Sequence, residues 1–262
     1  MIMKKVSLIL TTYNCADNLK KTLSAIESQE YKNVEVCIAD SCSNDGTVEV
    51  IKEYALQQKV LKEDGKAYRD VVWKSEKDTG IYDGLNRSIS LATGDYLLVM
   101  NDEFTRTDAI SLLVKALEDL ESELPDKNVI GVHSDLIYAN DGKVVRTWKM
   151  GQGKISSGWM PAHPTLLLKA SVYKEYGLYD TSYVSAADYE YMVRILKDRK
   201  NVLAYVPMTL VSMFYGGTSS GGLYNYWRSI RESLRALRRN KVHFGLMITF
   251  LRTIRVALQF MI

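Results

Sequence analysis

Short apolar runs alternate with segments of helical periodicity over residues 1–100. The runs are brief and almost continuously apolar, which is typical of strands buried on both faces of a parallel sheet. The predicted strands are Lys5–Leu10, Val34–Ala39, Val71–Lys74 and Tyr96–Met100. The predicted helices between them are Asn18–Ser28, Thr47–Gln57 and Ile81–Ala92. This alternation predicts an α/β fold whose parallel strands are joined by right-handed crossovers.

The regular alternation ends after Met100. Asn, Asp and Gly at positions 140–142 separate two strand-like runs, which predicts a β-hairpin with a tight turn. The elements predicted in this part are a helix at Asp108–Glu121, a hairpin of Val129–Tyr138 and Lys143–Trp148, and helices at Ala170–Tyr176 and Ala187–Lys197.

Residues 224–262 form a basic tail. They hold eight Lys or Arg and one acid, Glu232, so the tail carries a charge of +7, whereas the whole chain carries +3. Apolar residues recur there at intervals of three and four, with arginines on the other faces, which predicts a basic amphipathic helix. The apolar face is Trp227, Ile230, Leu234 and Leu237, and the arginines are Arg228, Arg231, Arg235, Arg238 and Arg239.

The last segment, Phe244–Ile262, is more apolar, but Arg252 and Arg255 lie near its middle. Each would cost about 2.5 to 3.5 kcal/mol in a helix that crosses a membrane. One polar stripe of the helical wheel holds Gly245, Thr249, Arg252, Thr253, Arg255 and Gln259. The pattern favours a helix that lies in the membrane interface. The alternatives are that the tail packs on the rest of the chain, joins two copies of it, or reads RNA, for which no motif is present.

Composition adds the class of protein. With 262 residues, 47% hydrophobic and 25% charged, the chain has the profile of a globular domain with an appendage. Its three cysteines fit neither a disulfide framework nor a zinc site, so a reducing cytosol is expected. No basic leader followed by an apolar stretch and a cleavage site is visible, so no export signal is expected.

Polar clusters follow each of the four predicted parallel strands. They are Thr11–Asn14, Asp40–Ser41, Glu76–Asp78 and Asn101–Glu103. One such cluster would indicate only a turn. Four of them meet at one edge of the sheet, where open α/β sheets bind ligands, so we expect a binding crevice there.

The phosphate-binding loops of other nucleotide proteins are missing. Neither G-x-G-x-x-G nor G-x-x-x-x-G-K-[ST] occurs, and carboxylates stand in that region instead. A diphosphate beside Asp102 and Glu103 would be repelled unless a divalent cation bridged them, and oxygen ligands suit Mg²⁺ or Mn²⁺. Tyr13 offers a ring face to a base, and Asp40 an acceptor for an imide N–H such as that of uracil.

Five motifs in this order resemble those of family 2 glycosyltransferases, over residues 5–220. The family carries T-Y-N, D-x-x-S-x-D-G-T, E-x-D-x-G-I-Y-D-A-x-N-x-G, an acidic DXD-like motif and A-D-Y. In this chain they are Thr12–Asn14, Asp40–Thr47, Glu76–Arg87, Asn101–Glu103 and Ala187–Tyr189. At the acidic motif relatives usually read N-S-D-D, whereas this chain reads Asn101-Asp102-Glu103-Phe104.

The resemblance implies a GT-A fold, which is a mostly parallel, Rossmann-like sheet flanked by helices. It also implies sugar transfer with inversion, as in bacterial surface polysaccharide biosynthesis. The implied donor residues are Thr11, Tyr13 and Asp40 at the nucleoside, Asp78 at its ribose or base, Arg87 near the phosphates, and Asp102. Asp102 and Glu103 would hold Mn²⁺ or Mg²⁺. Residues 1–222 would form the GT-A domain, with a nucleotide-binding half at 1–103 and an acceptor half at 104–222, before a helical tail at 223–262.

Inverting transfer needs a base for the acceptor hydroxyl and positive charge for the leaving group. By its motif Asp188 is the implied base; otherwise it is an N-cap or first-turn acid of a helix. His163 faces the acceptor side in the resemblance, or is structural. The Gly-rich stretch Gly216–Gly222 is either a lid over the donor or a linker.

The expected partners follow from this function. They are a nucleotide-sugar donor, UDP-linked by family habit, and a saccharide or lipid-linked saccharide acceptor. The tail predicts peripheral contact with the inner face of the cytoplasmic membrane, and a homodimer contact is its alternative; no nucleic acid is expected. Two other functions stay open, a sugar nucleotidyltransferase and a catalytically inactive GT-A-fold binding or scaffold subunit. The first would carry a phosphate loop after the first strand, which Thr11–Asn14 lacks.

Overall fold

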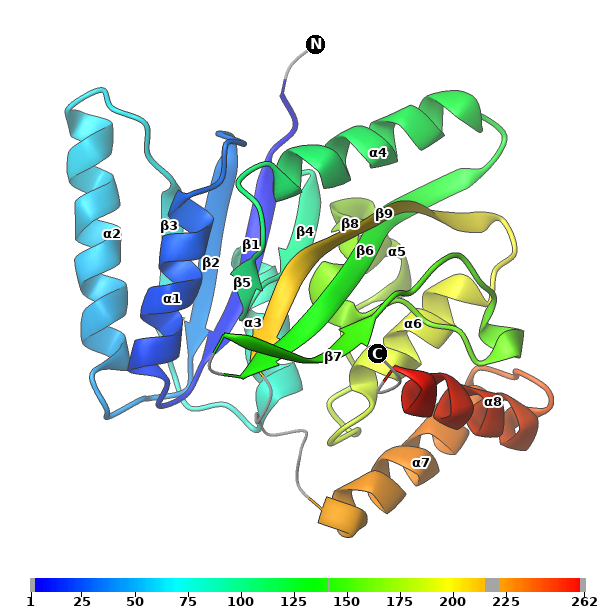
Figure 1. The fold of residues 1–262 in the computed structure, drawn as a ribbon. Helices are drawn as coiled ribbons and strands as arrows, with labels where there is room; N and C mark the ends of the chain where they lie inside the picture. Colours follow the sequence, from blue (N-terminus) through cyan, green and yellow to red (C-terminus); the bar gives the residue numbers. More distant parts are fainter. Residues whose placement is uncertain (1–2, 141, 215–221, 260–262) are drawn as a thin grey trace.

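The computed structural model describes residues 3–140, 142–214 and 222–259 (Figure 1). Its strands are β1 (Val6–Thr12), β2 (Val34–Asp40), β3 (Asp70–Ser75), β4 (Tyr96–Val99), β5 (Glu103–Phe104), β6 (Asn128–Asn140), β7 (Lys143–Trp148), β8 (Leu167–Lys169) and β9 (Asn201–Phe214). Within the described residues these strands form one sheet in the order β3-β2-β1-β4-β8-β6-β9-β5, and β7 pairs with β6.

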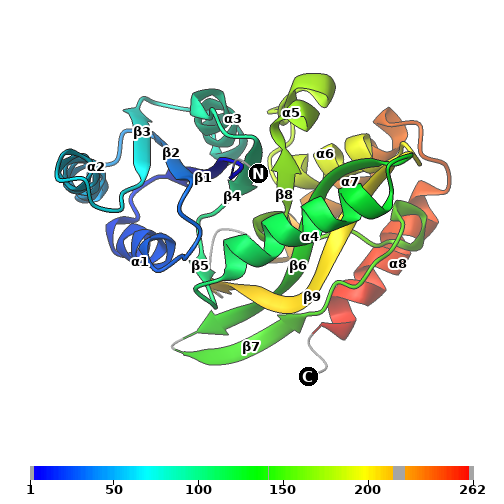
Figure 2. The ribbon, with the colours of Figure 1, turned by 90° about the horizontal axis from the view of Figure 1, so that it is seen from above.

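Helices cover both faces of this sheet. The α-helices are α1 (Ala16–Glu27), α2 (Thr47–Glu63), α3 (Ile81–Leu91), α4 (Ala109–Glu123), α5 (Ala170–Tyr176), α6 (Ala187–Leu196), α7 (Gly222–Arg239) and α8 (Gly245–Leu258), and the 3₁₀ turns are η1 (Ile155–Ser157) and η2 (His163–Thr165). Seen from above, α1, α2 and α4 lie on one face, and α3, α5 and α6 lie on the other (Figure 2).

The predicted parallel half is confirmed. Strands β1, β2, β3 and β4 are parallel neighbours, with Val6 opposite Val34 and Thr12 opposite Asp40. Alternate residues of β1 enter different cores. Leu8 packs in the cluster that includes residues of α1 and α4, and Ile9 packs in the cluster that includes residues of α3 and α6. Burial on both faces therefore explains why these strands are continuously apolar.

The second half contains the predicted hairpin of β6 and β7, whose turn includes residue 141, outside the described residues. It also contains a long strand that the sequence pattern did not predict. Strand β9 runs parallel to β6, and its register shifts so that Val206 pairs with Ser134 but Thr209 with Asp135. Pro207 lies in this bulge, where no ladder hydrogen bond is required of it. A proline inside an apolar run argues against a central strand, and here the bulge accommodates it.

The tail helices pack on the rest of the chain. Helix α7 contacts α6, and α8 contacts α7 and η1, so both lie at the end of the molecule away from α1 and α2 (Figure 1). Leu237 is fully buried, whereas Trp227, predicted on the same apolar face, is 62% exposed. No helix of the described residues is long and apolar enough to cross a membrane. The predicted lid residues before Gly222 lie outside the described residues, and Gly222 begins α7.

Candidate active site

The four polar clusters meet at the carboxyl edge of β1 to β4. The Thr11 backbone N–H donates to Asn101 Oδ1 at 3.0 Å, which joins the ends of β1 and β4. The Ser41 N–H donates to the Thr12 carbonyl at 2.9 Å, and the Glu76 N–H donates to the Asp40 carbonyl at 2.9 Å. Backbone pairing thus continues past the ends of the strands and holds the polar clusters in fixed positions at this edge.

Asp40 is buried at this edge and fully engaged with the protein. Its carboxylate accepts from the Thr12 hydroxyl at 2.9 Å, from the Ser75 hydroxyl at 2.6 Å, and from both the N–H and the hydroxyl of Ser43. Burial would raise the pKa of Asp40, but these hydrogen bonds outweigh it and hold the pKa below its usual range. Four donors use about all the lone pairs of a carboxylate. The nucleobase of a bound donor would therefore have to compete with these protein groups for the Asp40 carboxylate.

The turn after β2 is locked to the loop after β1. The Asn14 N–H donates to Ser43 Oγ at 2.9 Å, and the Asn44 N–H donates to Asn14 Oδ1 at 2.9 Å. The Asp45 carboxylate accepts from the Ala16 N–H and from both the N–H and the hydroxyl of Thr47. These bonds leave the side chain of the neighbouring Tyr13 in solvent.

Tyr13 is 66% exposed, and its ring is accessible to a ligand. Asp78 lies in the cluster that follows β3, where its Oδ1 accepts from the Gly80 N–H at 3.0 Å. Helix α3 approaches this point so closely that a Cβ at Gly84 would stand 3.0 Å from Asp78 Oδ2 and 3.2 Å from Thr11 Cγ2. The small residue lets the ends of β1 and β3 share one pocket wall with α3.

Arg87 projects from α3 and is held by two acids. It forms ion pairs with Asp83 at 3.3 Å and with Glu76 at 3.6 Å. The N–H of Thr79 and the Arg87 guanidinium both lower the pKa of Asp83. The predicted phosphate-side cation is therefore present beside the carboxyl end of β3, already paired with carboxylates.

Asp102 and Glu103 follow β4, and Glu103 pairs with Ser212 of β9. Burial raises the pKa of Asp102 to about 7, opposed by a hydrogen bond from the Phe214 N–H and assisted by the negative Glu103. Neither acid forms a salt bridge with a Lys or Arg of the described residues. Their charge is therefore not compensated within that part of the chain.

Asp102 and Glu103 form the candidate metal site. The described residues contain no group of three or more His, Cys, Asp or Glu side chains that could hold a metal ion. Mg²⁺, however, is commonly held by one or two carboxylates together with substrate phosphates. Two adjacent, uncompensated carboxylates fit a cation that a bound diphosphate helps to hold.

Asp188 lies in the first turn of α6 and does not cap it, because the N-cap position is Ala186. The hydroxyl of Tyr82, from α3, donates to Asp188 Oδ1 at 3.1 Å. Burial raises the pKa of Tyr82, and the negative Asp188 raises it further, so Tyr82 keeps its proton as a donor. One Asp188 oxygen is thereby fixed, and the other has no such partner among the described residues.

His163 belongs to the same cluster of side chains. Its Nε2 lies 2.5 Å from the Tyr179 hydroxyl, and the Tyr179 ring lies 6.0 Å from that of Tyr82, centroid to centroid. Burial lowers the pKa of His163, and the charge of Asp188 opposes this shift. The structure thus brings the two predicted residues Asp188 and His163 together, although 25 positions separate them in the sequence.

The side chain of Tyr138 interacts electrostatically with both Asp102 of the acidic motif and Asp188. Burial raises the pKa of Tyr138, Arg146 opposes the shift, and the charges of Asp102 and Asp188 both add to it. Both carboxylates therefore lie within electrostatic range of one tyrosine. The guanidinium of Arg146 lies 4.5 Å above the Tyr138 ring and 5.5 Å above that of Trp148.

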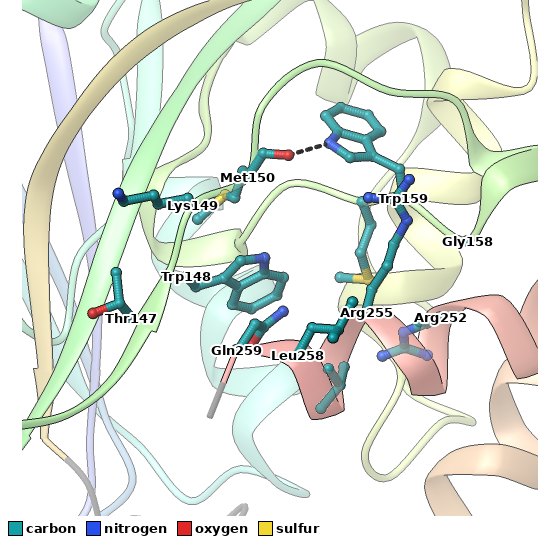
Figure 3. Close-up of a pocket in the computed structure, with 12 residues that line it drawn as sticks. Thr147, Trp148, Lys149, Met150, Gly158, Trp159, Arg252, Arg255, Leu258 and Gln259 are labelled. Carbon is teal, nitrogen blue, oxygen red and sulfur yellow. Dashed lines mark hydrogen bonds between the residues drawn. The ribbon is translucent and has the colours of Figure 1, made fainter. Parts of the chain in front are cut away.

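A cavity of about 490 Å³ lies behind Trp148, between β7 and α8 (Figure 3). Two indole rings, Trp148 and Trp159, and two arginines, Arg252 and Arg255, line it. Figure 3 shows the Trp159 Nε1–H directed to the Met150 carbonyl, at 2.9 Å. None of the predicted donor or catalytic residues lines this cavity. It is joined to them through Trp148, Arg146 and Tyr138.

Comparison with protein families identifies the family of this chain. The model described as glycosyl transferase family 2 matches residues 7–163, which is more than half of the chain. The chain belongs to glycosyl transferase family 2. The matched region includes four of the five motifs and ends at His163.

Individual family 2 relatives and solved structures agree. The chain is 26% identical, over 83% of its length and 68% of the relative's, to the dolichyl N-acetyl-alpha-D-glucosaminyl phosphate 3-beta-D-2,3-diacetamido-2,3-dideoxy-beta-D-glucuronosyltransferase of Methanococcus voltae. TarS of S. aureus in complex with UDP-GlcNAc is similar in structure, with a TM-score of 0.66, 14% identity, and coverage of 96% of this chain and 72% of that one. A mannosyltransferase of Pyrobaculum calidifontis in complex with GDP-Man and Mn²⁺ has a TM-score of 0.65, 17% identity, and coverage of 98% and 74%. These likenesses confirm the GT-A fold.

Sequence reasoning missed several residues of this family 2 site. Tyr82 and Asn86 stand within a motif that was found, but without an assigned role. The Asn86 amide donates to the Tyr179 carbonyl at 2.9 Å and accepts from the Tyr179 N–H at 3.0 Å, which ties the loop before α6 to α3. Tyr138 and Arg146 carry no motif. Only the pairing of β6 with β7, where these two residues are partners, reveals them.

Proposed function

We propose that this family 2 protein moves a sugar from a nucleotide-sugar donor to a saccharide or lipid-linked saccharide with inversion. The observation that carries the proposal is the meeting of the crevice at the sheet edge with the Asp188, Tyr82 and His163 cluster, through Tyr138. A donor held at the crevice would present its sugar to a carboxylate that is already oriented.

The donor side is proposed from exposed groups. Tyr13 is placed to stack on the base, Asp78 to bind the ribose or base, and Thr11 to line the nucleoside pocket. Arg87 is proposed to face the diphosphate. Asp40 acts chiefly by holding the turn of the D-x-x-S-x-D-G-T motif, because its oxygens already accept four hydrogen bonds. A UDP-sugar is the proposed donor, and the similar structures contain UDP-GlcNAc or GDP-Man.

Asp102 and Glu103 are proposed to hold Mn²⁺ or Mg²⁺ with the donor diphosphate. When bound, the cation would neutralise charge on the leaving nucleoside diphosphate. The raised pKa of Asp102 supports the assignment, because a buried carboxylate without a Lys or Arg partner gains from a cation.

Asp188 is proposed as the general base. The Tyr82 hydroxyl holds Oδ1, so Oδ2 is left to take the acceptor hydroxyl proton. The acceptor oxygen then forms the glycosidic bond while the bond from the anomeric carbon to the phosphate oxygen breaks, and the nucleoside diphosphate leaves. His163 is proposed to contact the acceptor through its neutral ring.

The acceptor is proposed to be part of a surface polysaccharide, carried on a lipid at the inner face of the cytoplasmic membrane. The name of the Methanococcus relative describes transfer to a dolichyl-linked sugar phosphate. The cavity between β7 and α8 supports this, because indole rings stack on sugars and arginines bind phosphate.

The test of the catalytic assignment is Asp188→Asn. Release of UDP or GDP from UDP-GlcNAc and GDP-mannose is followed with Mn²⁺ present. We expect turnover to fall about a hundredfold to ten-thousandfold, because proton transfer contributes that much. Donor binding, followed by the thermal shift, should be unchanged. Asp198→Asn, in the exposed turn that follows the same helix, is the matched control. Equal turnover in Asp188→Asn and wild type would remove Asp188 from the mechanism.

Metal use is tested with Asp102→Asn in the same assay. Chelation should abolish the turnover of wild type, and Asp102→Asn should lose most of its turnover and its Mn²⁺-dependent thermal shift with donor.

Donor binding without turnover in wild type at any metal concentration would favour the inactive binding subunit. Incorporation of pyrophosphate into the nucleotide would favour the nucleotidyltransferase.

A further inference from the structure

Helix α8 turns its polar side toward the protein. Its Arg252 guanidinium lies 4.1 Å above the ring centroid of Tyr189, from α6, and donates to Ser233 Oγ at 2.6 Å, from α7. The neighbouring Thr249 is only 8% exposed. Most of the stripe that the sequence predicted as the polar face therefore lies against the protein.

The same contacts continue along the helix. Arg255 donates to the Ser157 carbonyl at 3.0 Å, and Gln259 accepts from Arg146 Nε at 2.9 Å. The backbone of α8 is so close to Gly158 that a Cβ there would stand 2.4 Å from the Arg252 backbone nitrogen. The orientation of α8 is thus fixed from one end to the other.

The opposite side of α8 is apolar and faces solvent. It consists of Leu246, Met247, Phe250, Ile254 and Leu258, which are 73%, 52%, 64%, 40% and 55% exposed. A surface helix of a water-soluble domain has the reverse arrangement, with its apolar stripe toward the core. Scattered exposed apolar residues are ordinary, but a continuous stripe marks an interaction surface.

Positive charge without an acidic partner in the described residues lies on α7, which packs against α8, and just after it. Arg231, Arg238 and Lys241 are exposed, and none forms a salt bridge with an acid in the described part of the chain. Trp227 is four positions before Arg231, and Arg231 is seven before Arg238, so the three share one side of α7. Trp227 is 62% exposed. By contrast, Arg239 is paired with Asp180 at 2.5 Å. Arg231 and Arg238, which share the outer side of α7 with Trp227, and Lys241 just after the helix therefore have no acidic partner among the described residues.

We propose that α8 and the outer side of α7 dock on an anionic lipid bilayer. The apolar stripe of α8 would enter the boundary between headgroups and acyl chains, and Arg231, Arg238 and Lys241 would lie beside anionic headgroups. A second copy of this chain is a poorer occupant, because a two-fold contact would bring two such basic surfaces together.

Docking in this orientation would also place the cavity on the membrane side of the molecule. Its use for a lipid-linked acceptor rests on the proposed function. The cavity lies between β7 and the protein-facing side of α8, and Leu258 of the apolar stripe also lines it (Figure 3). Its rim at Leu258 would therefore lie next to the bilayer when α8 docks. Arg146, which covers Tyr138 near Asp102 and Asp188, is held by Gln259 at the end of the same helix. A lipid-linked acceptor would thus meet the reaction centre from the membrane side.

The test is flotation of the full chain with vesicles of phosphatidylcholine, alone or mixed with phosphatidylglycerol. Wild type should float with the mixed vesicles and bind the neutral ones weakly. Phe250→Ser with Ile254→Ser should weaken binding about thirtyfold, because most of two apolar side chains is withdrawn from lipid. Leu56→Ser with Val60→Ser is the matched control, since these residues are also exposed, apolar and four positions apart, on α2.

Charge is tested separately with Arg231→Glu and Arg238→Glu. Their binding to the mixed vesicles should fall at least about thirtyfold, and Lys21→Glu with Lys52→Glu, on α1 and α2, is the control. Equal flotation of wild type and the α8 variant would overturn the inference. So would a dimer in solution that the α8 variant dissociates. Thermal shifts with nucleotide sugars should be unchanged in every variant, so failure of flotation and failure of the proposed donor site are distinguishable.

Discussion

Two aspartates at the ends of the strands that flank β1 differ because of their surroundings. Asp40 ends β2 and is buried, whereas Asp102 follows β4 and is half-buried. Four hydrogen bonds hold the pKa of Asp40 low, whereas the single backbone donor of Asp102 leaves its pKa raised to about 7 by burial. Burial disfavours the charged form in both cases. Four donors reverse the outcome for Asp40, whereas one donor does not for Asp102, where the negative Glu103 adds to the rise. Asp40 is thus suited to hold a turn, and Asp102 to meet a cation.

A buried histidine should make the protein sensitive to acid. His133 is fully buried between the rings of Tyr205 and Trp159. Burial lowers its pKa from 6.5 to about 4, so the unfolded chain takes up the proton first as the pH falls. The free energy of unfolding should therefore decrease by up to about 3 kcal/mol between pH 6.5 and pH 4 from this residue alone.

The measurement is urea denaturation of wild type and His133→Gln at the two ends of this range. The variant should be less stable at neutral pH, because it loses ring packing, but its stability should fall less on acidification. His243→Gln is the control, since His243 is exposed. An equal loss on acidification in wild type and His133→Gln would contradict the assignment to His133.

At the scale of elements, the packing of α3 explains why its motif contains a glycine, Gly84, and an amide residue, Asn86. Gly84 permits the close approach to Thr11 and Asp78, and Asn86 binds both backbone groups of Tyr179. The helix therefore connects the donor crevice to the loop that precedes Asp188. A sequence comparison finds these residues as a pattern, and the packing gives the reason for each.

The tail helices should be needed for the stability of the whole chain. Ala236 and Leu237 of α7 and Ile248 of α8 belong to the same buried cluster as residues of α6 and β8. A chain that ends at Phe214 should therefore unfold at lower urea, with a loss of at least about 3 kcal/mol from Leu237 and Ile248 alone. Chemical denaturation of the shortened chain checks this. Unchanged stability would mean that α7 and α8 form a separate unit, as the boundary at residue 222 implies. Because the shortened chain is expected to lose stability, membrane binding is best tested by point substitutions.

At the scale of the molecule, one sheet carries both predicted halves. Strands β1 to β4 carry the proposed donor residues at their carboxyl edge, and β6 and β9 continue the sheet beside them through β8. Asp102 and Asp188 come from the two halves and meet near Tyr138. The proposed reaction centre therefore depends on the connection between the halves and belongs to neither alone.

The sequence by itself determined the parallel half, the hairpin, and the residues at the sheet edge. Those features follow from local apolar periodicity and from the rule that parallel strands end together. It also indicated Asp188 and His163 through ordered motifs. Such signals are local, so they survive without knowledge of long-range packing.

Only the tertiary structure decided which groups are free and which way helices face. Asp40 proved saturated because its donors come from three separate segments, and β9 pairs despite Pro207 because a bulge receives it. Helix α8 has an evident apolar and an evident polar side in the sequence, but periodicity cannot say which side meets the protein. Specific partners for Arg252 and Arg255 settled that choice, and they left the apolar side outward.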